Sequence, residues 1–162
     1  MSGLVIRLTR VSPTHHRFEV VREDGSREAR EMETRSCLFH DLVHFAVETE
    51  AQLAHSFYGL LASGARYEDL MKTDAKGAQE IAATEFVVGP LSGLLKHDEP
   101  VEPFLAMMAN VCESLGQRLP AWLTAEFIAR VRARMRALEG EWRATPFGAA
   151  MELHFPLEPD AG

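Results

Sequence analysis

The residues from Cys37 to His55 have the types and spacing with the greatest potential for chemistry. Read as one α-helix, the segment gathers its reactive side chains on a stripe about 80° wide. The stripe consists of His40, His44, Glu48 and His55, with Asp41 and Gln52 on its flank. Apolar residues fill most of the remaining circumference, which predicts a largely buried helix. The polar stripe must therefore face water, a partner or a lined site.

Metal binding is one chemistry that this stripe supports. His40 and His44 are one helical turn apart, the spacing of two zinc ligands on one helix. The pattern differs from His-Glu-x-x-His, because Asp41 stands where that motif has its glutamate base. The rise from His40 to Glu48 is about 12 Å, too long for both side chains to bind one ion. A metal site would therefore pair His44 with His40 or with Glu48.

This hypothesis describes a metal-dependent hydrolase that holds a divalent ion such as zinc. The ion activates water, and Asp41 either acts as the base or orients a ligand. The remaining ligands would come from elsewhere in the chain. Metal-free acid/base catalysis by a histidine is a further alternative, but no nucleophile accompanies it, since Cys37 is predicted to be a buried, inert thiol.

On sequence grounds we favour a structural interpretation of the stripe. Asp41, His44 and Glu48 would form a polar network that fixes the position of the helix. The chain would then act through protein contacts, with a homodimer as the expected assembly. The reason is that no complete catalytic constellation is visible, and no glycine-rich loop indicates a nucleotide cofactor.

Strands are the first elements expected to position this helix. Residues 4–8 and 18–22 alternate between inward and outward side chains, which predicts two strands with one buried face. The Asp24-Gly25 turn signal predicts a third strand over residues 27–33, whose mostly charged side chains suit a sheet edge. Residues 151–155 alternate in the same way and predict a closing strand.

Helices are expected to fill the middle of the chain. Ser36 is the predicted N-cap of the helix that continues towards Leu61. Further helical segments are predicted over residues 67–72, 75–96 and 103–115, followed by a last helix opened by Pro120. Thr73 or Asp74 would cap the second of these segments, and Pro90 would kink or divide it. The sequence predicts a single α+β domain over residues 1–162, with the first and last strands in one small antiparallel sheet.

Composition narrows the range of partners and locations. The chain has 162 residues, 46% hydrophobic residues and a formal net charge of -7, as expected for a folded domain. This negative charge disfavours nucleic acid and anionic membranes as partners. The two cysteines are expected to be reduced, and neither a signal peptide nor a membrane span is visible, so we expect a cytoplasmic protein.

Arginine residues flank the apolar stripe of the last helix, over the segment Arg130–Arg143. Nearby glutamates dilute their charge, and Phe127 and Trp142 lie on the apolar arc rather than beside the arginines. Nucleic-acid binding would need exposed aromatic side chains among the cations. A self-association surface or an acidic partner fits this helix better.

A resemblance adds to these expectations. The stretch from Asp41 to Glu48, the segment 57–64, Trp142 and the strand 151–156 together resemble a group of uncharacterised bacterial proteins. The resemblance implies a bacterial cytosolic domain and carries no assigned activity. Asp41, His44 and Glu48 are the positions that it singles out.

Overall fold

The computed structural model describes residues 3–70 and 78–156 as an α+β fold. Its sheet has four antiparallel strands in the order β3-β2-β1-β4, so the N-terminal strands and the C-terminal strand share one sheet, as predicted. The strands are β1 (Gly3–Arg10), β2 (His15–Val21), β3 (Arg27–Glu33) and β4 (Ala150–Pro156). Six helices of the described residues complete the fold: α1 (Thr34–Glu50), α2 (Phe57–Ala62), α3 (Tyr67–Leu70), α4 (Ala78–His97), α5 (Val101–Ser114) and α6 (Ala125–Ala144).

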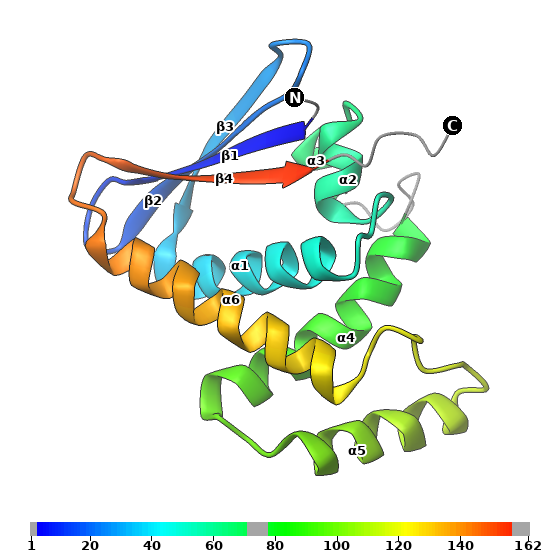
Figure 1. Cartoon of the computed structure of the whole chain (residues 1–162). Helices are drawn as coiled ribbons and strands as arrows, with labels where there is room; N and C mark the ends of the chain where they lie inside the picture. The colour runs from blue at the N-terminus through cyan, green and yellow to red at the C-terminus, as the bar shows by residue number, and fades with distance from the viewer. Residues whose placement is uncertain (1–2, 71–77, 157–162) are drawn as a thin grey trace.

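The sheet buries one face, as the alternating sequence predicts. Ile6 lies opposite Val20 on β2 and Leu153 on β4, and all three side chains are buried. Helices α1 and α6 lie side by side against the sheet (Figure 1). Among the described strands, the charged strand β3 pairs with β2 alone and forms an edge of the sheet, as predicted.

Helix α1 packs against both α6 and α4, and this position explains its composition. Val43, Ala46 and Val47 are completely buried, because neighbouring elements surround this helix. The last helix follows its predicted stripe: Phe127, Ile128 and Val131 are buried. A polar side chain on the inner part of α1 therefore needs a partner within the protein.

The predicted continuation of the first helix to His55 and Leu61 is wrong. Helix α1 ends at Glu50, and Gln52 has a left-handed φ of 55° that redirects the chain. The chain then packs tightly: a Cβ atom on Gly59 would lie 1.9 Å from the carbonyl oxygen of Ala54. Glycine allows this close approach, and a separate helix, α2, begins at Phe57. His55 is consequently exposed and does not belong to the α1 stripe.

The starts of two helices, α1 and α6, also differ from the predictions. Glu33 rather than Ser36 precedes the first residue of α1, and the Ser36 hydroxyl donates to the Glu33 carboxylate at 2.9 Å. Thr124 caps α6 by accepting a hydrogen bond from the Phe127 amide at 3.1 Å, so Pro120 lies outside this helix. Of the two outcomes predicted for Pro90, a kink or a division, the division is wrong, because α4 continues through this residue. The predicted caps Thr73 and Asp74 lie outside the described residues.

The described helices include none that is long and apolar enough to cross a membrane.

A buried arginine ties the sheet to the helices above it. The Arg22 guanidinium donates to the carbonyl oxygens of Leu61 at 2.6 Å and Ala65 at 2.8 Å, and forms an ion pair with Glu28 at 2.6 Å. The other carboxylate oxygen of Glu28 accepts the Tyr67 amide at 2.9 Å. This network fixes the chain between α2 and α3 relative to the sheet.

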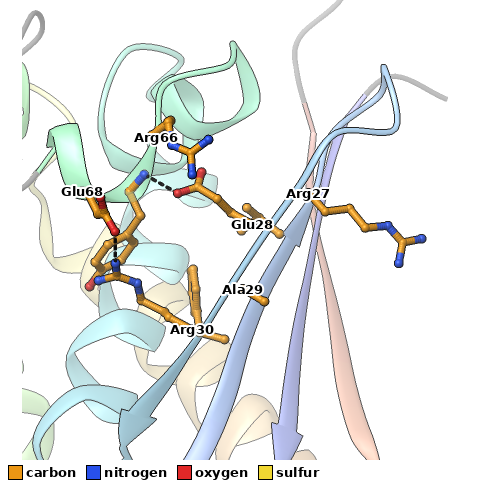
Figure 2. Close-up of a pocket in the computed structure, with 9 residues that line it drawn as sticks. Arg27, Glu28, Ala29, Arg30, Arg66 and Glu68 are labelled. Atoms are coloured by element: carbon orange, nitrogen blue, oxygen red, sulfur yellow. Dashed lines mark hydrogen bonds and ion pairs between the residues drawn. The ribbon is translucent and has the colours of Figure 1, made fainter.

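Strand β3 also contacts α3 through Arg30. Its guanidinium lies 3.9 Å from the centre of the Tyr67 ring and 3.6 Å from the Glu68 carboxylate. Figure 2 shows Glu28 and Arg30 reaching from β3 towards α3, while Arg27 points away. These contacts hold Tyr67 in place, and Tyr67 forms part of the wall of the candidate site.

We predict that Arg22→Ala lowers the free energy of unfolding by roughly 3 kcal/mol, because it leaves Glu28 and two carbonyl oxygens without their buried donor. Urea denaturation measures the change. Arg17→Ala, an exposed position on β2, the strand that Arg22 directly follows, is the control and should change the value by less than about 0.5 kcal/mol. Equal effects of the two substitutions would contradict the role assigned to Arg22.

Candidate functional site

Three potential metal ligands converge where α1 packs against α4. His40 and His44 come from α1, and Glu85 comes from α4. The Glu85 carboxylate lies 2.6 Å from Nε2 of His44 and 3.2 Å from Nε2 of His40. One ligand atom from each of the three side chains lies within 4.8 Å of the others. Helix packing therefore brings together residues that are far apart in the sequence.

A buried carboxylate holds His44 from the other side. Nδ1 of His44 donates to Oε2 of Glu48 at 2.9 Å, and Oε1 of Glu48 accepts the Tyr58 amide at 2.9 Å. The Glu48 side chain has 0% exposure, so protein donors rather than solvent form the hydrogen bonds to both of its oxygens. This pair of hydrogen bonds fixes the His44 ring and points its Nε2 towards Glu85 and His40.

The charges of this cluster are strongly coupled. Burial by itself would lower the pKa of His44, but hydrogen bonds and attraction from Glu48 and Glu85 raise it to about 9. Burial raises the pKa of Glu48, although its hydrogen bond to His44 opposes the shift. Burial would also raise the pKa of Glu85. The hydrogen bond and attraction from His44, together with the attraction of His40, outweigh this effect and lower the pKa of Glu85. His44 is thus an imidazolium between two carboxylates at neutral pH.

A cavity of about 240 Å³ opens beside the three convergent side chains. Asp41 lines this cavity, and its Oδ2 atom is buried without a hydrogen-bond partner among the described residues. Burial raises the pKa of Asp41 to about 7, against the attraction of His44. The cavity therefore contains a proton-accepting group next to the histidine cluster.

The structure separates the roles of the residues predicted from the sequence. His40 and His44 come together at the cavity, with their ring centres 4.8 Å apart. Glu48 lies behind His44 and holds its Nδ1 atom, while Asp41 lines the cavity. Cys37 also lines the cavity and is half-buried, not buried as predicted, although burial still raises its pKa.

Sequence reasoning missed Glu85. It lies on α4, 41 positions after His44, and no local spacing connects the two residues. One signal was available: Glu85 follows Ile81 by four residues, so it shares the helical face that the pattern assigns to packing. A carboxylate at the border of an apolar face indicates a polar partner on the opposing helix.

Several arginines of α6 form ion pairs within the chain. Arg130 and Arg134 form ion pairs with Glu50 at the end of α1, at 3.3 Å and 2.8 Å. Arg132 approaches Asp98 at 3.7 Å. These contacts join α6 to its neighbours and leave less of the helix for an acidic partner.

Comparison with known proteins identifies no relative. No protein-family model matches the chain, and no curated protein or solved structure is significantly similar to it. The function is therefore inferred from the geometry of the chain itself.

The His44 cluster predicts a characteristic dependence of stability on pH. A pKa raised from 6.5 to about 9 contributes stability that is complete below pH 6.5 and is lost as the pH rises through about 9. For the metal-free protein, the free energy of unfolding should fall over this range by up to about 1.4 kcal/mol per pH unit. Urea denaturation at a series of pH values measures the slope.

His44→Gln should remove most of this slope above about pH 8, where Asp41, whose pKa is about 7, is about nine-tenths ionised. His154→Ala, an exposed position on β4, is the control and should retain it. Identical slopes in the wild type and His44→Gln would show that His44 does not carry a raised pKa.

Proposed function

We propose that the chain binds one divalent metal ion through His40, His44 and Glu85 and uses it to activate water, as a metal-dependent hydrolase. The observation that carries this proposal is the convergence of the three side chains on a cavity, with a buried carboxylate behind His44. Compared with the pairs considered from sequence alone, Glu85 supplies the missing third ligand and Glu48 acts on His44 from behind.

The donor atoms suit a transition-metal ion. Two imidazole nitrogens and one carboxylate oxygen are a common set for zinc and for other first-row divalent ions. Three protein ligands leave a coordination position for water, which distinguishes catalytic from structural zinc sites. Ligand atoms around one ion lie roughly 3 to 4 Å apart, so small side-chain rotations are sufficient to close this site.

Glu48 gives His44 the environment of a metal ligand. Ligating histidines almost always donate their second ring N–H to a carboxylate, a carbonyl or water, which fixes the ring and makes the ligating nitrogen more basic. Glu48 accepts this hydrogen bond at 2.9 Å and is itself held by the Tyr58 amide. The hydrogen bond by which Glu48 would fix the position of the helix is then the same hydrogen bond that would orient His44 as a ligand.

Water activation would involve the ion and Asp41 together. A bound divalent ion lowers the pKa of its water to about 7, and a nearby carboxylate can accept the proton that is released. Asp41 lines the same cavity and follows His40 directly in α1. It is the group best placed to serve as the base.

Zinc binding tests this proposal. Protein expressed without a histidine tag should bind one equivalent of zinc, measured by elemental analysis after removal of free metal. His44→Ala and Glu85→Ala should bind less than about a tenth of an equivalent, because each removes a ligand. Glu48→Gln should weaken binding about 10- to 100-fold, because it weakens the hydrogen bond that orients His44.

Glu80→Ala is the matched control, since it removes an exposed carboxylate from the same helix as Glu85. Zinc-loaded wild-type protein should hydrolyse 4-nitrophenyl acetate, and Asp41→Asn should lower the rate while zinc remains bound. Less than a tenth of an equivalent of zinc in the wild type would contradict the metal site. Bound zinc without zinc-dependent hydrolysis would contradict the hydrolase.

Helix α5 supports a second function, contact with another copy of the chain. One face of α5 packs inward through Phe104, Met108 and Cys112. Met107, Val111 and Leu115 follow one another at four-residue spacing and are 45%, 38% and 57% exposed. Figure 1 places α5 at the end of the molecule farthest from the sheet. Its apolar arc is therefore wider than the surface that residues 3–70 and 78–156 cover.

This face has the features of a self-complementary interface. A hollow of about 420 Å³ lies at the first turn of α5, lined by Pro100, Pro103 and Met107. The exposed Val111 and Leu115 lie towards the other end of the same helix, and residues 103–112 include no charged side chain. In an antiparallel pair, the apolar end of each α5 would fill the hollow of the other, as a twofold interface requires.

Val111→Glu should convert the resulting homodimer to a monomer, because it places a charge at the centre of the apolar face. Sedimentation velocity over a range of concentrations measures the change. Val11→Glu, at a 48% exposed position in the turn between β1 and β2, is the control and should leave the dimer intact. A monomeric wild type, or a Val111→Glu dimer, would contradict this interface.

A further inference from the structure

The cavity beside His40, His44 and Glu85 has a chemically mixed lining. Its polar lining residues are these three together with Ser36, Cys37 and Asp41. Its largely apolar lining residues are Met32, Phe57, Tyr67 and Ile81. A molecule that fills the cavity must therefore combine a polar group with an apolar substituent.

The charge of the cavity disfavours anions. No lysine or arginine occurs among the described residues that line it, whereas Asp41 and Glu85 do. Arg30 lies against the Tyr67 ring and pairs with Glu68, and it lines a different hollow. With a metal ion in place of the proton on His44, a phosphate or sulfate ester would find no lysine or arginine among the described lining residues to balance its second charge.

Asp41 adds a requirement for a hydrogen-bond donor. Its Oδ2 atom is buried, and no described residue donates to it. The Tyr58 hydroxyl donates at 2.9 Å to the backbone carbonyl of Asp41, so it does not satisfy the side chain. A largely buried carboxylate that accepts no hydrogen bond from the described residues is unfavourable, and because Asp41 lines the cavity, a ligand N–H there would supply a donor to this carboxylate.

We propose that the substrate is a small neutral carboxylic amide. Its carbonyl oxygen would bind the metal ion, its N–H would donate to Asp41, and its apolar substituent would pack against Met32, Phe57 and Ile81. This inference rests on the proposed hydrolase function. It adds the class of the substrate and gives Asp41 a role in selecting it.

The reaction is balanced with water as the only co-reactant. The oxygen of water forms a bond to the carbonyl carbon, and one proton of water passes to the Asp41 carboxylate. The carbon–nitrogen bond then breaks, and that proton moves to the leaving nitrogen. The products are an amine and a carboxylic acid, which carries the second proton of water.

Three probes test the inference by calorimetry on the zinc-loaded full chain: benzohydroxamic acid, its N-methyl analogue and phenylphosphonate. The first two probes both bind zinc, but only the first has an N–H. We expect benzohydroxamic acid to bind at least about tenfold more tightly than either other probe. Asp41→Ala should reduce the preference for the N–H to less than about twofold while one equivalent of zinc remains bound. Glu80→Ala should change neither value.

Equal affinities of the two hydroxamates in the wild type would overturn the inference, as would a preference for phenylphosphonate. An undiminished N–H preference in Asp41→Ala would also overturn it, because the donor would then be recognised elsewhere. In each of these outcomes the zinc site survives. Failure of the wild type to bind zinc would instead overturn the proposed function together with this inference.

Discussion

The hydrogen bonds of Glu48 are the interaction on which the site depends. This carboxylate is completely buried, and its two oxygens accept from Nδ1 of His44 and from the Tyr58 amide. An unpaired carboxylate at this depth would be strongly destabilising, so the surrounding elements must supply both donors together. The Tyr58 amide becomes available because α1 stops at Glu50 and the chain returns as α2. The break after α1 and the orientation of His44 are therefore one structural feature.

The hydrogen bond to Glu48 also determines what the other ring nitrogen of His44, Nε2, can bind. With Nδ1 bound to Glu48, Nε2 faces Glu85 across the α1–α4 contact, and Glu85 also pairs with His40 on α1. Without a metal ion the two carboxylates keep His44 protonated, and an ion bound at the proposed site would have to displace that proton. Proton and metal would then compete for one nitrogen. The network that stabilises the fold would also hold His44 in place for the ion.

The sequence predicts the fold much better than the site. Alternation in residues 4–8, 18–22 and 151–155 identifies the strands, because burial of one sheet face imposes a period of two. The first helix and its chemically active stripe are also apparent. The end of this helix is not apparent from the sequence, because the turn after Glu50 depends on a left-handed Gln52 and on the close approach of Gly59 to Ala54. Glu85 is invisible for a related reason: only the packing of α4 on α1 brings it to His44, and no periodicity encodes that distance.

Anomalous diffraction at the zinc absorption edge, from crystals grown with zinc, tests the central claim most directly. The account predicts a single strong peak bonded to Nε2 of His40, Nε2 of His44 and a carboxylate oxygen of Glu85. Nδ1 of His44 should remain hydrogen-bonded to Glu48. Crystals that contain zinc at no such position, or a His44 ring that has turned away from Glu48 to bind the ion, would contradict it.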